Sequence, residues 1–309
     1  METLELKQSV SFKNILLATD FSAVSKNALA YAAMIAGGHD SKIYLVHVIP
    51  PRARTAIPIE PLPPELNTEH LDAELAMQTF ARGDELKGVR HEELLERGPI
   101  WDVLSELMQS DAIDLLVLGT HGRGGLKKII LGSVAEELFR LAVCPVLTVG
   151  PAVPAETAGA KEFHCILFAT DFGLASLRAL PYAISLAKAS EAKLVLLHVL
   201  LPMPVLDVGP YWYVGTDVVK RQETARLDAL ERLKKLIPPD LNLTSPPEFL
   251  VGFDSVAEEI VKNAADSRTD LIVMGVNRAA FARASAHLPW ATAHEVVCHA
   301  KCPVLTVRD

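Results

Sequence analysis

The sequence repeats itself once, and this repeat limits what the chain can fold into more than any other feature. Ile15–Phe21 returns, with one change, as Ile166–Phe172, and Cys144–Val149 returns unchanged 158 residues later. A repeat of about 150 residues has the size of a domain, whereas a solenoid unit is much shorter. The chain is therefore expected to form two homologous domains joined by a linker of small residues and proline. The predicted domains are 1–150 and 161–309.

Each copy alternates short apolar runs with stretches of helical spacing, which predicts strands and helices in alternation. The predicted strands are 14–19, 42–48, 91–95, 115–118 and 146–149 in the first copy, and 164–170, 193–199, 248–251, 270–275 and 304–307 in the second. The predicted helices of the first copy are 24–36, 67–86, 100–108 and 134–142, with an irregular proline-rich stretch at 50–64 and a glycine pair at 37–38 that stops the first helix. The alternation predicts an α/β fold whose parallel sheet is covered on both faces. In such sheets, ligands bind beyond the carboxyl ends of the strands, where the winding reverses.

A glycine-rich loop follows the fourth predicted strand of the first copy. Its glycines and the basic residues beside them are Gly119, Gly122, Gly124 and Gly125, with His121, Arg123, Lys127 and Lys128. Glycine lets backbone amides come close to a ligand. Gly132-Ser133 then opens a predicted helix, where Ser133 can act as the cap and the free N–H groups suit a phosphate. The segment predicts an anion-binding site, with a surface loop that binds nothing as the alternative.

The spacing is that of neither of the two commonest nucleotide motifs. Lys127 follows leucine rather than glycine, which excludes a P-loop, and the dinucleotide fingerprint is absent. The chain instead has Gly119-x2-Gly122-x9-Gly132-Ser133. This pattern resembles the nucleotide-binding signature of the universal stress protein family, and the resemblance extends over nearly the whole chain. It implies two tandem doubly wound domains of the adenine-nucleotide alpha hydrolase-like fold, with five-stranded parallel sheets in the order 3-2-1-4-5.

The resemblance also implies which residues of the first domain bind ATP. Asp20 matches the family's aspartate near the ribose and adenine, and Val48 matches the residue whose backbone meets the adenine ring. Gly119 and Gly122 match the glycines that lie along the phosphates. Ala18 stands where many members have proline or valine, a mild departure that should not abolish binding. The residues expected at the nucleotide are Ala18, Asp20, Val48, Leu118, Gly119, His121, Gly122, Arg123, Gly132, Ser133 and Val134.

The second copy departs from this pattern on the side of the phosphates. When the copies are aligned, Arg278 and Trp290 replace two of the loop glycines, and Ala291 replaces the serine at the helix start. Asp171 nevertheless keeps the place of Asp20. The second copy is therefore expected not to hold a triphosphate in the family's manner. Whether it has lost binding or changed its ligand is left open.

Charge and composition argue against several classes of function. A net charge of −8 and a pI near 5.7 argue against general binding to nucleic acid or to acidic membranes. No apolar run reaches the roughly 18 residues of a membrane span, and the acidic start lacks the features of a signal peptide. Four cysteines are too few for a disulfide framework. The chain is therefore expected to be cytoplasmic.

Three other features allow competing interpretations. His47 and His198 each lie near the end of a predicted strand and are expected to be hydrogen-bonded structural residues rather than bases. A group of zinc-type ligands near the C-terminus matches no established zinc spacing, so no metal site is predicted. Its members are His294, Cys298, His299 and Cys302. The sequence does not decide whether Tyr211–Tyr213 lines a pocket, an interface or the core.

The first interpretation is a tandem universal stress protein that binds ATP in its N-terminal domain and acts as a stress-response sensor or regulator. Mg²⁺ would arrive as the counter-ion of the nucleotide, and no constellation predicts a catalytic residue. The alternatives are an enzyme that hydrolyses ATP slowly or cleaves an adenylyl bond, and a scaffold that binds no nucleotide. The resemblance also implies an intramolecular pseudo-dimer in which 146–149 meets 304–307. A further homodimer is left open.

Overall fold

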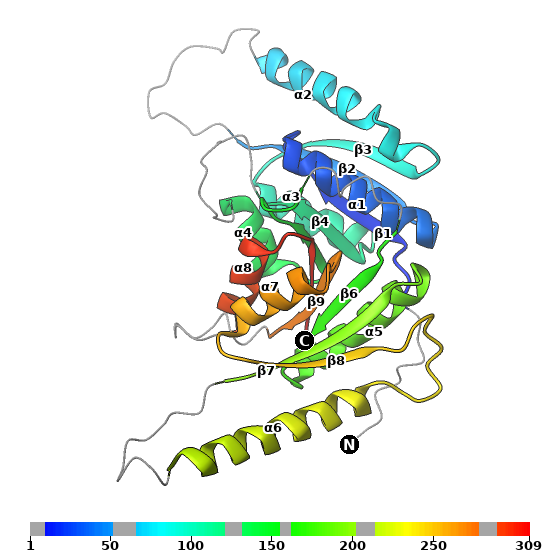
Figure 1. The fold of residues 1–309 in the computed structure, drawn as a ribbon. Helices are drawn as coiled ribbons and strands as arrows, with labels where there is room; N and C mark the ends of the chain where they lie inside the picture. Colours follow the sequence, from blue (N-terminus) through cyan, green and yellow to red (C-terminus); the bar gives the residue numbers. More distant parts are fainter. Residues whose placement is uncertain (1–9, 52–65, 121–131, 155–161, 202–213, 278–288) are drawn as a thin grey trace. The chain divides into compact units, whose positions relative to one another are not determined.

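The structure is a computed structural model, and it describes residues 10–51, 66–120, 132–154, 162–201, 214–277 and 289–309. The chain divides into two compact units. Residues 11–162 form the bulk of the first unit and residues 163–296 the bulk of the second. Each unit is an α/β layered structure (Figure 1). The boundaries 1–150 and 161–309 stay a prediction.

The first unit is built on five parallel strands in the order β3-β2-β1-β4-β5. This is the order that the family resemblance implied. The elements are β1 (Asn14–Ala18), α1 (Ala23–His39), β2 (Lys42–Ile49), α2 (Leu66–Ala81), the 3₁₀ turn η1 (Asp84–Leu86), β3 (Arg90–Arg97), α3 (Ile100–Ser110), β4 (Leu115–Gly119), α4 (Ser133–Leu141) and β5 (Val146–Val149). Because the chain winds from β1 out to β3 and then returns to β4, the winding reverses between β1 and β4.

The second unit repeats this plan, with five parallel strands in the order β8-β7-β6-β9-β10. Its elements are β6 (Cys165–Ala169), α5 (Leu174–Ala189), β7 (Lys193–Leu200), α6 (Val214–Leu236), β8 (Glu248–Phe253), α7 (Val256–Asp266), β9 (Leu271–Val276), α8 (Pro289–His299) and β10 (Val304–Arg308). The winding reverses between β6 and β9, the counterparts of β1 and β4. The sequence repeat is thus a repeat of topology.

Burial explains why the central strands are continuous apolar runs while an outer strand is not. Residues 15–17 of β1 and 166–168 of β6 are fully buried, as expected of strands with helices on both faces. The outermost strand of the first unit, β3, differs because residues 90–93 are exposed and read Arg-His-Glu-Glu. The predicted strands of both copies are therefore present, with ends that differ by only a few residues.

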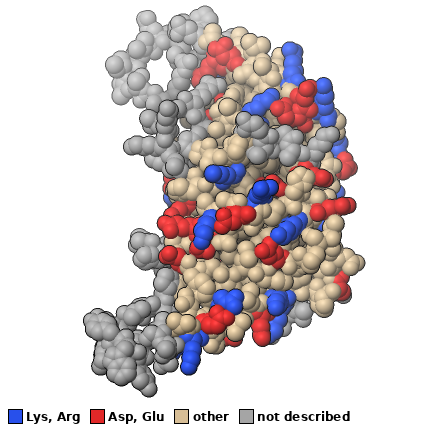
Figure 2. Space-filling model, in the orientation of Figure 1, with Lys and Arg blue, Asp and Glu red and all other residues tan. Residues whose placement is uncertain are grey.

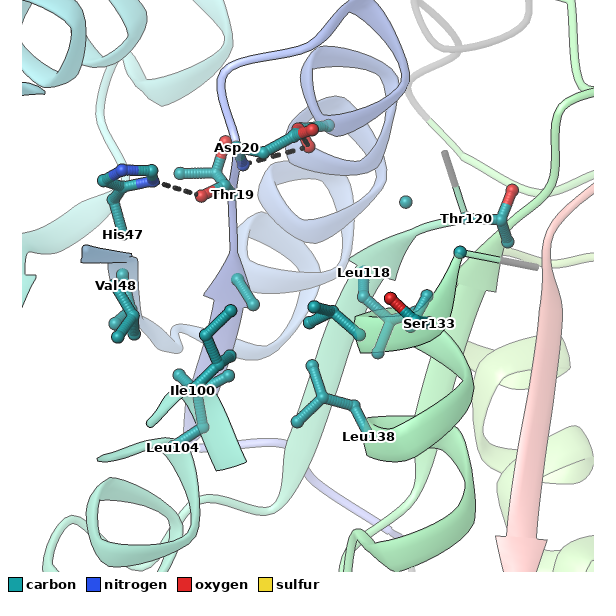
Figure 3. Close-up of a pocket in the computed structure, with 17 residues that line it drawn as sticks. Thr19, Asp20, His47, Val48, Ile100, Leu104, Leu118, Thr120, Ser133 and Leu138 are labelled. Carbon is teal, nitrogen blue, oxygen red and sulfur yellow. Dashed lines mark hydrogen bonds between the residues drawn. The ribbon is translucent and has the colours of Figure 1, made fainter. Parts of the chain in front are cut away.

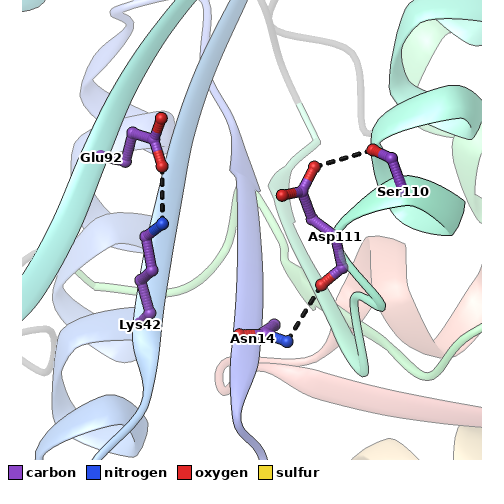
Figure 4. A network of polar contacts seen from close by, with 5 residues as sticks. All are labelled: Asn14, Lys42, Glu92, Ser110 and Asp111. Atoms are coloured by element: carbon purple, nitrogen blue, oxygen red, sulfur yellow. Dashed lines mark hydrogen bonds and ion pairs between the residues drawn. The ribbon is translucent and has the colours of Figure 1, made fainter.

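Polar contacts hold the amino ends of the first unit's strands (Figure 4). Lys42 Nζ lies 2.6 Å from Glu92 Oε2 and joins β2 to β3. Asn14 Nδ2 donates to the carbonyl oxygen of Asp111 at 3.0 Å. The carboxylate of Asp114 accepts from the backbone N–H of Asn14 at 3.3 Å, and burial raises its pKa. These groups stabilise the amino end of the sheet, opposite the end at which a ligand is expected.

Two predicted helix ends are wrong. Helix α1 does not stop at the glycine pair but continues to His39, and it ends because Asp40 takes a left-handed conformation with φ of 51°. The predicted helix 67–86 is two elements, because α2 ends at Ala81 and η1 follows separately. The irregular stretch predicted at 50–64 lies mostly outside the described residues.

The predicted cap of α4 is also wrong. Gly132 is the N-cap and no side-chain hydrogen bond caps this helix, so Ser133 is its first residue rather than its cap. The reason is the backbone. The N–H of Gly132 donates to the carbonyl of Thr120 at 2.8 Å, and its carbonyl accepts from the N–H of Glu136 at 2.8 Å. These two bonds place Gly132 at the boundary and Ser133 inside the first turn.

On the face shown in Figure 2, lysine and arginine side chains are interspersed with aspartate and glutamate. Within the described part of the chain, no helix is both long enough and apolar enough to cross a membrane. The pairing of 146–149 with 304–307 would join the two units, and it stays a prediction. The cytoplasmic location and the lack of a nucleic-acid partner stay predictions too.

Candidate functional site

A cavity of about 240 Å³ opens at the carboxyl ends of β1, β2 and β4, where the winding of the first unit reverses. Figure 3 shows that its apolar side chains come from separate elements, including Val48 at the end of β2, Ile100 and Leu104 of α3, and Leu138 of α4. The residues that line it are Ala18, Thr19, Asp20, Ser25, Val46, His47, Val48, Ile100, Leu104, Leu118, Gly119, Thr120, Gly132, Ser133, Val134, Ala135 and Leu138. We call it the first cavity.

Asp20 is the acidic residue of this lining, and its environment keeps it charged. Its Oδ1 accepts from the hydroxyl of Ser25 at 2.6 Å and from the backbone N–H of Ser22 at 3.0 Å. Burial acts to raise the pKa of Asp20, but the hydrogen bonds from Ser25 and Ser22 outweigh burial and hold the pKa below its ordinary value. The carboxylate is therefore ionised at neutral pH and can only accept hydrogen bonds.

Phe21 and His47 hold the corner of chain that follows β1. Phe21 has a φ of 64°, a left-handed conformation that is rare for a bulky residue. Its ring lies 4.4 Å from the ring of His47 and 5.7 Å from that of Phe80. His47 Nδ1 donates to the carbonyl of Thr19 at 2.7 Å, because a carbonyl can only accept. The prediction that His47 is hydrogen-bonded is confirmed, and that it is not a base stays a prediction.

The start of α4 brings backbone N–H groups to the opposite side of the first cavity. Gly132, Ser133, Val134 and Ala135 all line it. The N–H of Gly132 is used by Thr120, which leaves the next N–H groups of the first helical turn directed to the helix end. A Cβ atom added at Gly132 would lie 3.1 Å from the carbonyl oxygen of Thr120, which is a tight contact. Glycine thus lets the helix begin close to the end of β4.

The structure brings together the described members of the predicted binding set. These residues all line the first cavity: Ala18, Asp20, Val48, Leu118, Gly119, Gly132, Ser133 and Val134. The other three, His121, Gly122 and Arg123, lie outside the described residues, as do Lys127 and Lys128. Their part in binding stays a prediction.

Several lining residues were missed by sequence reasoning. Ile100 and Leu104 stand four apart on α3 and present one apolar face to the cavity. The sequence shows this spacing, but the spacing alone does not tell whether the face lines a ligand site or packs in the core. Ser25 follows Asp20 by five residues, and only the turn between β1 and α1 brings its hydroxyl to the carboxylate. Thr120 lies just past β4 with its side chain buried.

The profile of the universal stress protein family matches residues 11–150 and again residues 162–308. The chain belongs to the universal stress protein family. The double match agrees with the two units and with the strand order that they share.

Individual relatives agree with this assignment. A universal stress protein of Methanocaldococcus jannaschii is 36% identical over 142 residues, which are 45% of this chain and 82% of the relative. A universal stress protein of Mycolicibacterium smegmatis is 28% identical over 233 residues, which are 73% of this chain and 75% of the relative. A solved universal stress protein from Archaeoglobus fulgidus has a TM-score of 0.62 at 19% identity, covers 96% of this chain and is covered to 98%, and so shares the fold.

The second unit of this universal stress protein repeats the corner that carries the aspartate. Asp171 Oδ1 accepts from the hydroxyl of Ser176 at 2.7 Å and from the N–H of Gly173 at 2.8 Å. His198 Nδ1 donates to the carbonyl of Thr170 at 2.8 Å, so His198 is hydrogen-bonded as predicted. Burial lowers the pKa of His198, so the ring is neutral at neutral pH.

The cysteine and histidine residues near the C-terminus do not form a metal site in this structure. Among the described residues, which include His294, Cys298, His299 and Cys302, no group of three or more His, Cys, Asp or Glu side chains could hold a metal ion. Burial raises the pKa of Cys302 to about 12, so its thiol stays protonated. Cys144 is buried as well, with its Sγ 3.8 Å from the Sδ of Met108, which fits packing. Tyr211–Tyr213 lies outside the described residues.

Proposed function

We propose that this universal stress protein binds ATP in the first cavity and acts as a nucleotide-dependent sensor or regulator. The observation that carries the proposal is the convergence, on one cavity, of an ionised aspartate, apolar walls and the start of a helix. These are the three kinds of group that adenosine and its phosphates need. The adenine suits an apolar slot, the ribose hydroxyls suit an acceptor, and the phosphates suit a helix start.

The residues of the cavity divide into these parts. The adenine fits beside Val48, Ile100 and Leu104. Asp20 offers acceptor oxygens to the ribose hydroxyls, and the backbone at Ser133 offers N–H donors to the phosphates. A bound ATP shifts the protein between two conformations by the difference in its affinity for them, and this shift is what a sensor transmits. Mg²⁺ would arrive with the phosphates.

The arrangement favours binding over catalysis. The titratable side chains among the described residues of the lining are Asp20 and His47. The Nδ1 of His47 is committed to the carbonyl of Thr19. The hydrogen bonds from Ser25 and Ser22 hold the pKa of Asp20 below its ordinary value, which makes its carboxylate a weak base at neutral pH. A role as a sensor therefore fits this lining better than a role as a dedicated hydrolase.

Calorimetry with ATP tests the proposal, and the repeat supplies a matched control. Asp20→Ala removes the acceptor from the first cavity, and Asp171→Ala makes the same change in the second unit. We expect one molecule of ATP per chain, with affinity roughly tenfold to hundredfold lower in Asp20→Ala because a hydrogen bond to a charged group contributes about 1.5–3 kcal/mol. Asp171→Ala should bind as the wild type does.

A protein that is folded by circular dichroism but binds no ATP would refute the proposal and favour the scaffold. Loss of ATP binding in Asp171→Ala but not in Asp20→Ala would place the site in the second unit and contradict the proposal. The products after incubation decide the remaining alternative, because AMP with pyrophosphate would identify an enzyme that cleaves the adenylyl bond. ATP recovered intact supports the sensor.

A further inference from the structure

Helix α2 presents two exposed leucines on the side that faces away from its own unit. The helix contacts β2 and β3 (Figure 1), and Ala73, Met77 and Phe80 on its inner side are buried. Leu71 and Leu75 are 57% and 65% exposed. Because each residue of a helix turns about 100°, they lie roughly opposite Ala73 and Met77. Residues four apart are neighbours on a helix surface, so the two leucines form one apolar patch. We call it the leucine patch.

The corresponding helix of the second unit, α6, has no such pair among its described side chains. Its exposed large apolar residues, Val219 and Leu227, stand eight apart. Glu223 stands midway between them on the same side, and its carboxylate lies 2.7 Å from the guanidinium of Arg226. Single exposed apolar side chains are normal on a protein surface, so those of α6 indicate no partner. The leucine patch is therefore a feature of the first unit.

Two exposed charged residues flank the leucine patch, and neither forms an ion pair with a residue that the structure describes. They are Asp72 and Arg82. Arg82 continues the last turn of α2, because its N–H donates to the carbonyl of Gln78 at 3.2 Å. Several neighbouring charges, in contrast, are paired: His70 with Glu74, Lys87 with Asp84, and Lys26 with Glu85. The surface thus leaves one acidic and one basic group available to a partner.

This arrangement is complementary to itself when two α2 helices pack in antiparallel directions. Asp72 and Arg82 are ten residues apart, about 15 Å along the axis, so opposite charges of the two copies approach each other. In a pair centred on Leu75, Arg82 lies about 6 Å along the axis from Asp72 of the second copy, which the long arginine side chain can span. Two-fold symmetry forms this ion pair twice. A parallel pair in register would bring like charges together, which is unfavourable.

We propose that α2 is a dimerisation surface, on which a second copy of this chain packs its own α2 in the antiparallel direction. Burial of Leu71 and Leu75 of both copies provides the affinity, because removing apolar surface from water is favourable. The pairing of Asp72 with Arg82 sets the direction, since exposed ion pairs contribute little stability whereas like charges are strongly disfavoured. One pair of helices is smaller than a standard interface of about 800 Å² per partner, so the dimer is weak and reversible.

Sedimentation equilibrium of the full chain tests the dimer, at concentrations up to about 1 mM, the weak end of the usual range of affinity. We expect the mass to double as the concentration rises. Leu75→Glu should weaken the association at least tenfold, because it places a charge in an apolar contact. The control is Leu227→Glu on α6, at a leucine that is 51% exposed, and it should leave the association unchanged. Circular dichroism shows whether both variants are folded.

Exchange of the flanking charges distinguishes this surface from any other. Asp72→Arg and Arg82→Asp should each weaken self-association at least tenfold, because each brings like charges together at both ends of the helix pair. An equimolar mixture of the two variants should restore the dimer, since opposite charges then meet at both ends.

Three results would overturn the proposal. They are a wild-type chain that stays monomeric over the whole range, a dimer that Leu75→Glu leaves intact, and a mixture of the two charge variants that associates no more tightly than either variant alone.

Discussion

Two regions have diverged to different extents between the two units. One is the corner of chain after the first strand, and the other is the rim of the site at the start of the last helix, which is α4 in the first unit and α8 in the second. At the corner, the histidine Nδ1 lies 2.7 Å from its carbonyl partner in one unit and 2.8 Å in the other. The ring centroids of phenylalanine and histidine are 4.4 and 4.5 Å apart. The φ angles of Phe21 and Phe172 are 64° and 61°. At the rim, in contrast, the sequence differs, because Trp290 and Ala291 stand where the first unit has Gly132 and Ser133.

The difference shows which features belong to the fold and which to a ligand. The corner is the same although the rim has changed, so the corner is required by the turn from strand to helix, whatever the cavity holds. The strained φ at Phe21 and Phe172 costs about 1–2 kcal/mol, and aromatic packing offsets it. At the rim, in contrast, helix α8 begins at Pro289 where α4 begins at Ser133.

The glycines at the ends of β4 and β9 make the same point. A Cβ at Gly275 would collide with backbone atoms of Ala175 and Ser176 at the start of α5. A Cβ at Gly119 would meet Val24 Cγ1 at 3.0 Å and the backbone N of Ser25 at 3.1 Å, which is tight but can be relieved by a small shift. Gly275 is therefore required by packing, and its presence says nothing about phosphate binding in the second unit.

The largest expected loss of stability comes from replacing these two glycines by alanine. Gly275→Ala should lower the free energy of unfolding by about 3 kcal/mol, at the upper end of the cost of overpacking. Gly119→Ala should lower it by about 1 kcal/mol, because part of its contact is with the movable side chain of Val24. Urea titrations followed by circular dichroism measure both values. Equal losses would show that the two helix starts approach their strands equally closely.

The next largest loss of stability is expected from the serines whose hydroxyls donate to the two aspartates. Ser25→Ala removes the bond to Asp20 and should cost about 2 kcal/mol, the contribution of a hydrogen bond to a charged group. Ser176→Ala should cost a similar amount, because its hydroxyl donates to Asp171 and accepts from Thr170 Oγ1 at 3.0 Å, as the Ser25 hydroxyl donates to Asp20 and accepts from Ser22 Oγ at 3.3 Å. Denaturant titration of both variants gives the comparison. A loss in only one unit would contradict the equivalence of the corners.

The corner of the first unit also predicts a dependence of stability on acid. The pKa of Asp20 is lowered in the folded protein, so its contribution to stability is complete above the unfolded value of 3.8 and is lost as the pH falls through the folded pKa. Ser25→Ala raises that pKa toward its ordinary value and should reduce this loss. Two-dimensional NMR titration of the carboxyl carbons measures the shift. An unchanged pKa in Ser25→Ala would contradict the cause assigned here.

A smaller effect is expected from His198 as the pH falls. Its pKa is lowered from 6.5 by burial, and the charge of Arg232 also lowers it, whereas the bond to Thr170 and the charge of Asp171 oppose the shift. Below pH 6.5 the unfolded chain binds a proton that the folded protein does not, so stability falls as the pH decreases from 6.5 through the folded pKa. Unfolding measured across this range should show a slope that His198→Gln removes and His164→Gln, at an exposed position, retains.

The smallest expected effect belongs to Arg232. Its guanidinium carbon lies 3.9 Å from the ring centroid of Phe172, and Arg232→Ala should cost about 0.5–1 kcal/mol. In the first unit, Lys26 Nζ lies 5.8 Å from the ring of Phe80, so Lys26→Ala should cost less through this contact. Thermal unfolding of the two variants measures the difference. A larger loss in Lys26→Ala than in Arg232→Ala would contradict this predicted order.

Much of this architecture could be predicted from the sequence, because it depends on local signals. The repeat and the apolar runs predicted the strands that the structure describes, and the family resemblance predicted that Asp20, Val48 and Gly119 lie at one site, where they line the first cavity. Helix ends were harder. Gly37 and Gly38 lie inside α1, which ends only at the left-handed conformation of Asp40. Ser133 lies in the first turn of α4 because the N–H of Gly132 donates to the carbonyl of Thr120.

Two parts of the site could not be predicted from the sequence. Ile100 and Leu104 have the spacing of any core-facing helix, and only their position over the end of β2 makes them cavity walls. The second unit has a cavity at the carboxyl ends of β6, β7 and β9, lined by aliphatic residues such as Leu200, Val256 and Met274, and it was also missed. The replacement of the loop glycines by Arg278 and Trp290 indicated a lost phosphate site and gave no sign of these aliphatic walls. Those walls form from β7, α7 and β9, which are far apart in the chain.

The exposed start of β3 has a consequence for assembly. An outermost strand with free backbone groups invites another chain to add a strand, and charged side chains are a common means of preventing this. Residues 90–93 carry three charged side chains and a histidine at this edge. A second copy that extended the sheet at β3 would have to remove these charges from water. Growth of fibrils or dimers through this edge is thereby disfavoured.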